Sequence, residues 1–187
     1  ADLGPGGTSV SLFHGTAEGV KNVLNSPPEF PSEVVGFRFG ATEQEARIAC
    51  ERNGGEFVTT AVLRAAGVQT IAPAVGCNHP QVELPFDVRN AYAMFCDDRI
   101  CEVGLVLGGS LEAALAAMSG KYGAPRSFTE PDDCKPVAAR HLWAWGAIGV
   151  VTGTVKLSDN CGPAVYYDNA LGYQLRDQER VRRKQNF

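Results

Sequence analysis

The spacing of apolar side chains predicts two helices, each followed by a group of strands. Thr42 and Glu45 have the spacing of a capping box, which predicts that the first helix starts there. Its narrow apolar stripe consists of Ala46, Ala49 and Cys50. Two glycines at 54–55 end the helix. Because the stripe is narrow, we expect this helix to pack by one face only.

The second helix begins after Ser110, a residue suited to cap it. The apolar positions at helical spacing are Leu111, Leu115, Met118 and Tyr122. Gly123 and Pro125 end the helix. A shorter helical patch over 17–25, with Thr16 as its cap, stands near the start of the chain.

Alternating or continuous apolar runs predict the strands. They cover 56–63, 87–96, 101–107, 141–148, 150–157 and 163–168. No strand is followed by the glycine-rich turn and helix of a nucleotide-binding sheet. We therefore predict an α+β fold in which two capped helices pack on one face of an antiparallel sheet. The order also allows two similar units, each a helix followed by strands.

The chain divides into three parts by composition. We expect residues 1–35 to form an N-terminal arm with a short helix, 36–175 a single α+β domain, and 176–187 a basic C-terminal tail or helix. The tail has five basic and two acidic residues between Arg176 and Lys184. Such a segment is typical of a solvated helix, and alternatively of one that docks on an acidic partner or on phospholipid headgroups.

The segment Phe95-Cys-Asp-Asp-Arg-Ile-Cys101 suits a hairpin whose two cysteines face each other. A two-residue turn at Asp98-Arg99 would place Cys96 opposite Cys101, close enough for a disulfide. The same register predicts one apolar face made of Tyr92, Met94, Cys96, Cys101, Val103 and Leu105. We favour a structural disulfide; free buried thiols and a metal or redox site are the alternatives.

Cysteine usage bears on the compartment. The chain has six cysteines and three histidines and no Cys-x-x-Cys pair, which argues against a thiolate-rich zinc site. For the other cysteines we propose Cys50–Cys77 and Cys134–Cys161, which gives a disulfide-stabilised domain. Six cysteines allow fifteen connectivities, and only the hairpin pair is argued from geometry. Such usage, and a start at Ala1-Asp2 without methionine, favours a periplasmic or secreted protein. We expect no metal.

Charge and hydropathy exclude two classes of partner. The net charge is −4, so we expect no general attraction to nucleic acid. No apolar run reaches the roughly 20 residues of a membrane-spanning helix.

Four segments resemble small exported bacterial proteins in which helices cover an antiparallel sheet. The segments are Gly36-Phe-Arg-Phe-Gly-Ala-Thr-Glu-Gln-Glu-Ala46, Lys121-Tyr-Gly-Ala-Pro125, Trp143-Ala-Trp145 and Val165-Tyr-Tyr-Asp168. The group includes β-lactamase-inhibitor-protein-like domains and small outer-membrane-assembly lipoproteins. The resemblance covers 36–187 and implies an exported fold that binds a protein or small ligand, with no catalytic residues. The long arm, the six cysteines and the lack of a lipidated N-terminal cysteine depart from that pattern.

Leu12-Phe-His-Gly-Thr16 resembles the first motif of ADP-ribosyltransferases, in which a His-Gly-Thr segment holds NAD. The resemblance implies that His14 and Thr16 act on this cofactor. No later glutamate stands out as the catalytic one that such enzymes need. A helix cap at Thr16 after a tight turn is the simpler interpretation.

Trp143 and Trp145 have the same strand parity and so point to one face. They either pack in the core under the second helix, against Leu115 and Met118, or form an aromatic binding patch on an open face. His141 begins the same predicted strand and is a candidate to line a site, whereas a structural histidine is the commoner case. No Gly-x-Ser-x-Gly elbow of a serine hydrolase is present.

These observations favour an exported, non-enzymatic binding or inhibitory domain that recognises a protein or small ligand without a cofactor. The alternative is an NAD-using ADP-ribosyltransferase-type enzyme built on His14 and Thr16.

Overall fold

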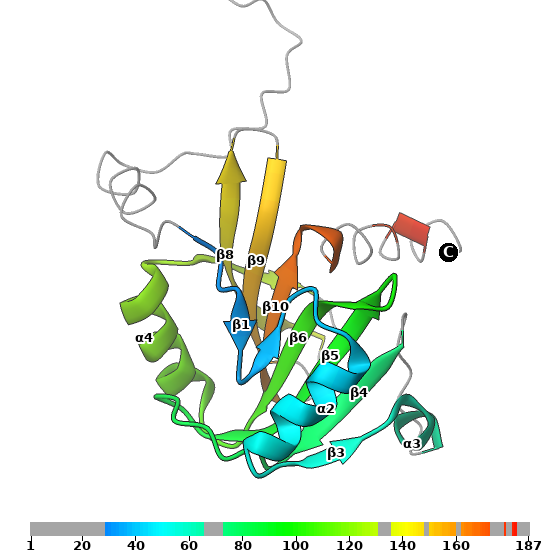
Figure 1. Cartoon of the computed structure of the whole chain (residues 1–187). Helices are drawn as coiled ribbons and strands as arrows, with labels where there is room; N and C mark the ends of the chain where they lie inside the picture. The colour runs from blue at the N-terminus through cyan, green and yellow to red at the C-terminus, as the bar shows by residue number, and fades with distance from the viewer. Residues whose placement is uncertain are drawn as a thin grey trace, which may run out of the picture.

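The computed structural model describes residues 29–65, 73–130, 136–147, 150–159, 162–172, 178 and 181–182. The elements, in chain order, are β1 (Glu33–Val34), β2 (Phe37–Arg38), α2 (Glu43–Arg52), β3 (Glu56–Val58), α3 (Thr60–Ala65), β4 (Ala74–Asn78), β5 (Val88–Cys96), β6 (Arg99–Leu107), α4 (Leu111–Tyr122), β7 (Arg126–Glu130), β8 (Ala138–Ala147), β9 (Val150–Asp159) and β10 (Pro163–Asn169) (Figure 1). None of the helices in these ranges is both long enough and apolar enough to cross a bilayer.

Eight strands form one antiparallel sheet in the order β3-β4-β5-β6-β10-β9-β8-β7. β1 and β2 form a separate two-stranded hairpin. The predicted α+β fold with an antiparallel sheet is therefore confirmed.

Helices α2 and α4 contribute to one hydrophobic core with the sheet. Ala46 and Ala49 from α2 belong to the same buried cluster as Ala114 and Met118 from α4. The sheet supplies Val103, Leu105, Val155, Leu157 and Val165, none of which is exposed. Figure 1 shows α2 in front of the sheet and α4 beside it.

Capping residues define where these helices begin. The Glu45 N–H donates to Thr42 Oγ1 at 3.4 Å, while the Thr42 N–H donates to the Glu45 carboxylate at 2.8 Å. In α4 the Ser110 hydroxyl accepts from the Ala113 N–H at 3.2 Å. Each cap satisfies backbone donors that have no partner within the first helical turn.

Several elements differ from the sequence prediction. The strand predicted over 56–63 stops at Val58, and Thr60 begins α3. β4 and β7 were not predicted: β4 is only five residues with a central glycine, and β7 is an edge strand of mostly polar residues.

The predicted boundary between arm and domain at residues 35 and 36 falls inside the β1–β2 hairpin. Val34 is buried, and the Phe30 ring packs 5.5 Å from the Trp145 ring. Residues 30–35 therefore pack with the body of the domain.

The β5–β6 turn lies one residue earlier than predicted. Asp97 and Asp98 are the turn residues, with φ of 49° and 59°, and Cys96 pairs with Arg99. Two successive positive φ angles suit the twist of a hairpin. Aspartate tolerates this conformation because its short side chain bonds locally. The predicted turn at Asp98-Arg99 is wrong.

This shift divides the predicted apolar face of the hairpin. Tyr92 pairs with Gly104 and Met94 pairs with Glu102, whereas Val103 and Leu105 belong to the core under the helices. The register skips Cys101, so a β-bulge brings its side chain to Cys96, with which it forms a disulfide.

Candidate functional site

A surface groove of about 340 Å³ lies where three segments meet: the β1–β2 turn, the C-terminal end of α2 and the chain that follows β4. We call it the corner groove. Its lining residues are Glu33, Val35, Gly36, Arg52, Asn53, Gln81, Val82, Glu83 and Leu84. A second groove of about 270 Å³, along α2, shares Glu33, Gly36 and Arg52 with it.

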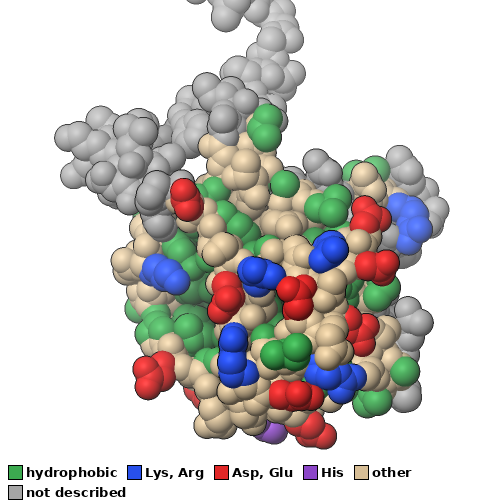
Figure 2. All heavy atoms as spheres, viewed as in Figure 1, with side chains coloured by type: hydrophobic (Ala, Val, Ile, Leu, Met, Phe, Trp, Pro, Cys, Tyr) green, Lys and Arg blue, Asp and Glu red, His purple; other side chains and the backbone are tan. Residues whose placement is uncertain are grey.

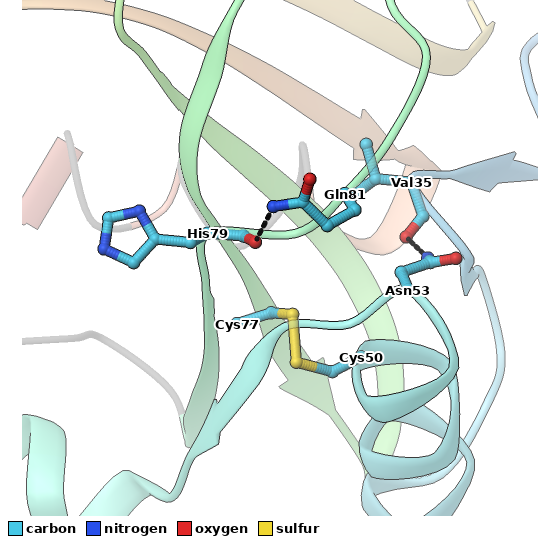
Figure 3. Close-up of a disulfide and its surroundings, with 6 residues drawn as sticks. All are labelled: Val35, Cys50, Asn53, Cys77, His79 and Gln81. Atoms are coloured by element: carbon cyan, nitrogen blue, oxygen red, sulfur yellow. Dashed lines mark hydrogen bonds between the residues drawn. A yellow bond between two sulfur atoms is a disulfide. The ribbon is translucent and has the colours of Figure 1, made fainter.

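A disulfide between Cys50 and Cys77 ties α2 to β4 beside the corner groove (Figure 3). The two Cα atoms are 5.7 Å apart, and both side chains are buried. Gly55 lies against this disulfide, and a Cβ at that position would overlap Cys77 Sγ. The glycine that follows α2 is therefore needed for close packing over the sulfur atoms.

Two hydrogen bonds of Asn53 fix the other walls of the groove. Its side-chain Nδ2 donates to the Val35 carbonyl at 2.9 Å, and its backbone carbonyl accepts from the Gln81 N–H at 2.7 Å. Figure 3 shows Asn53 and Val35 facing each other above the disulfide, with the His79 ring directed away. One residue at the end of α2 thus holds both the hairpin turn and the start of the following segment.

The β1–β2 turn carries backbone strain. Val35 has φ 47° and Gly36 has φ 86°. Positive φ is unfavourable for a β-branched residue and costs about 1–3 kcal/mol unless the surroundings compensate. Here the turn is held by Asn53 and by packing of the half-buried Val35 side chain against the core.

The charged side chains of the corner groove are unpaired. Glu33, Glu83 and Arg52 are exposed, and none makes an ion pair within the described part of the chain. Arg38, by contrast, forms an ion pair with Glu45 beside the second groove, with 2.8 Å between Nη2 and Oε1. In Figure 2, basic and acidic side chains are interspersed over this face of the molecule.

Glu45 combines a capping role with this ion pair. Its pKa lies below the ordinary value, chiefly because the Thr42 N–H donates to the carboxylate, with further contributions from the Thr42 hydroxyl and from Arg38. The Glu45 carboxylate is therefore ionised and caps the start of α2.

The two tryptophans lie in the core and not on an open face. Trp143 is 5% exposed and Trp145 is 9% exposed. The Trp143 Nε1 donates to the Gly123 carbonyl at 2.8 Å, and the Trp145 ring meets Tyr122 edge-on at 5.3 Å. The aromatic binding patch therefore fails, because it needs the opposite orientation. Nearby, burial raises the pKa of Tyr167.

His141 stands on β8, away from the lining of the corner groove. Its Nδ1 lies 2.8 Å from the Ser127 hydroxyl of β7. Burial lowers the pKa of the imidazole. The ring is half-buried beside a neighbouring strand, so it belongs to the packing of β7 on β8.

Two of the three predicted cysteine pairs, Cys50–Cys77 and Cys96–Cys101, are joined in the structure. Cys134 and Cys161 lie outside the described residues, as do His14, Thr16 and most of the basic tail. Within the described ranges, no three His, Cys, Asp or Glu side chains form a group that could hold a metal ion.

The corner groove was not predicted from the sequence. Asn53-Gly-Gly55 is typical of a helix end, and the stretch after Cys77 contains two prolines and alternates only over a few positions. The only local sequence signal is Gly36, which indicates a turn. The residues across the groove from it, 52–53 and 81–84, are remote in the chain.

Comparisons with protein-family models, with curated proteins and with solved structures find no match to this chain.

Proposed function

We propose that this chain is an exported, non-enzymatic domain that recognises another molecule through the corner groove. The observation that carries the proposal is a surface groove that has fixed walls and charges without an ion-pair partner among the described residues. Glu33, Glu83 and Arg52 surround it, while a disulfide and two hydrogen bonds hold its three segments. A preformed site loses little conformational entropy on binding, which favours affinity.

The ligand is proposed to be a protein, with a small molecule as the alternative. Sites for small molecules usually enclose most of the ligand surface. The corner groove is bordered by exposed side chains and continues along α2, where Ile48 is 53% exposed. An extended, partly apolar and partly charged surface of this kind suits a protein partner.

Two features support export and the proposed fold resemblance. Disulfides persist in oxidising compartments, and the structure joins two pairs of cysteines. A helix and four antiparallel strands occur twice, as α2 with β3–β6 and α4 with β7–β10, and β6 pairs with β10 at the centre. The first unit also contains α3, between β3 and β4. We propose that these are two similar units, as in the β-lactamase-inhibitor-protein-like group.

The test is capture of partners from a periplasmic or extracellular protein pool, followed by affinity measurement with each purified candidate. The groove variant is Arg52→Glu with Glu83→Arg, and the control is Arg126→Glu on the far edge strand. We expect a partner whose binding is weakened by the groove variant and unchanged by the control. A partner whose affinity is the same for the groove variant and the unmodified protein would contradict the proposal. So would release of nicotinamide from NAD that is lost in His14→Ala.

A further inference from the structure

The segment from Gln81 to Asp87 is not assigned to the sheet, yet its side chains alternate as in a strand. Val82, Leu84 and Phe86 are half-buried and pack against the core. The alternate positions, Gln81, Glu83, Pro85 and Asp87, are exposed. This alternation places the backbone of the segment along the surface, with one row of side chains directed to solvent.

The backbone of this segment is hydrogen-bonded only near its ends. The Gln81 N–H donates to the Asn53 carbonyl at 2.7 Å, and the Asp87 carbonyl accepts from the Gly108 N–H at 3.0 Å. Between these anchors, Val82, Glu83 and Leu84 make no hydrogen bond to any residue that the structure describes. Since a peptide group needs a partner, these groups are left to water or to another chain.

Two hollows adjoin the unpaired stretch and share Gln81, Val82 and Leu84. One is the corner groove, and the other is a pocket of about 510 Å³ lined by 79–82 and 84–89. An added strand presents side chains alternately, so hollows beside an unpaired backbone are the places where such side chains fit.

The charge of the exposed row indicates what the added strand carries. The row contains two carboxylates, Glu83 and Asp87, and no cation. Across the corner groove lie a third carboxylate, Glu33, and one cation, Arg52, so carboxylates outnumber cations around Glu83. Side chains directly opposite in paired strands stabilise each other when their charges are opposite. A lysine or arginine opposite Glu83 would meet this condition.

We infer that residues 82–84 pair with an extended segment of a partner protein that places a basic side chain opposite Glu83. The inference rests on the proposed binding function and names the partner's chemistry. The Gln81 hydrogen bond to Asn53 and the packing of Val82 and Leu84 against the core hold the receiving segment in place, so the partner's segment bears most of the ordering cost on binding.

The experiment selects binders from a displayed library of random linear peptides against the intact protein, and then measures amide hydrogen exchange. In the free protein we expect Val82, Glu83 and Leu84 amides to exchange quickly. On saturation with a selected peptide, exchange of the Glu83 amide slows by at least about tenfold, as for a newly paired amide, because an added strand pairs only every second N–H. The selected peptides share a lysine or arginine within an alternating pattern.

Two substitutions at one position separate charge from backbone. Glu83→Gln removes only the charge and weakens peptide binding by about two- to fivefold. Glu83→Pro also removes the N–H and weakens it by about a further fivefold. The control Glu51→Gln, an exposed carboxylate of α2 outside the grooves, leaves affinity unchanged. Proline at position 83 also restricts the backbone of Val82, so circular dichroism verifies that the Glu83→Pro protein is folded.

Several outcomes would overturn the inference. Slow exchange at Val82–Leu84 in the free protein would show that these amides are already paired. No enrichment of peptides, or protection at other residues, would remove this segment as the receiving strand. In both cases, the proposed function would still be supported by a purified protein partner whose binding is weakened by Arg52→Glu with Glu83→Arg. Protection that appears without peptide and rises with protein concentration would identify a second copy of the chain as the occupant instead.

Discussion

Asn53 and Val35 are eighteen residues apart in the chain, and a hydrogen bond of 2.9 Å from Nδ2 to the carbonyl joins them. This bond holds the end of α2 against a turn whose first residue is β-branched and has positive φ. A strained conformation persists only where neighbouring contacts over-determine it. The geometry of the corner groove therefore depends on this one contact as well as on the disulfide beside it.

Replacing Gly36 tests this dependence. Gly36 has φ 86°, and a Cβ there would lie 2.6 Å from Asn53 Nδ2. We expect Gly36→Ala to lower the free energy of unfolding by at least about 1–2 kcal/mol, because it adds left-handed strain and displaces the amide. Urea unfolding measures the change.

The matched control for this substitution is Gly120→Ala in α4. No atom lies within 4 Å of a Cβ at Gly120. Alanine should stabilise the helix by about 0.5–1 kcal/mol. If both substitutions had the same effect, the tight fit at Gly36 would be refuted.

The two disulfides should differ in their contribution to stability. Cys50 and Cys77 are separated by 27 positions, whereas Cys96 and Cys101 are separated by five. By restricting the unfolded chain, the longer loop contributes about 3–4 kcal/mol and the shorter about 2 kcal/mol. Unfolding of the double variants C50A/C77A and C96A/C101A measures both. A larger loss in the hairpin variant would show that native-state contacts outweigh loop length.

His141 gives stability a dependence on pH with a definite sign. Burial lowers the pKa of His141 in the folded protein from 6.5. At a pH between the lowered and the ordinary pKa, His141 binds more protons in the unfolded chain than in the folded protein. Stability therefore falls as pH decreases below about 6.5 and recovers as pH rises. His141→Gln keeps a polar group beside Ser127 without titrating.

The measurement for His141 is the free energy of unfolding of both proteins across pH 5 to 8, on either side of the ordinary histidine pKa of about 6.5. We expect the stability of wild type relative to His141→Gln to decrease as the solution is acidified. A relative stability that increases toward low pH would mean that the folded protein favours the charged imidazole.

The parts of the fold that were predictable depend on residues close in sequence. The starts of α2 and α4 follow from Thr42 and Ser110, because a cap acts on the next three residues. The Cys96–Cys101 disulfide follows from the closeness of the two residues in a short hairpin. The turn was placed one residue late because Asp97-Asp98 and Asp98-Arg99 both suit a two-residue loop. The bulge at Cys101, which restores the disulfide, has no local signal.

The corner groove was not predictable because it is built from contacts between remote segments. Asn53 bonds to Val35 before it and to Gln81 after it, and neither contact is encoded in a periodic pattern. The segment after β4 contains two prolines and alternates only over a few positions. Its alternation becomes informative once the core that Val82 and Leu84 contact is known.

Trp145 distinguishes a structural from a recognition role for the aromatic pair of β8. The ring is 9% exposed and packs against Phe30 and Tyr122 at centroid distances of 5.5 and 5.3 Å. Trp145→Ala should therefore lower the free energy of unfolding by about 3–5 kcal/mol through the cavity it leaves. Trp145→Phe retains most of the apolar volume and should cost clearly less. A Trp145→Ala protein that keeps its stability but loses affinity for a partner would return the tryptophan pair to the binding surface. Loss of stability in proportion to the volume removed would place it in the core.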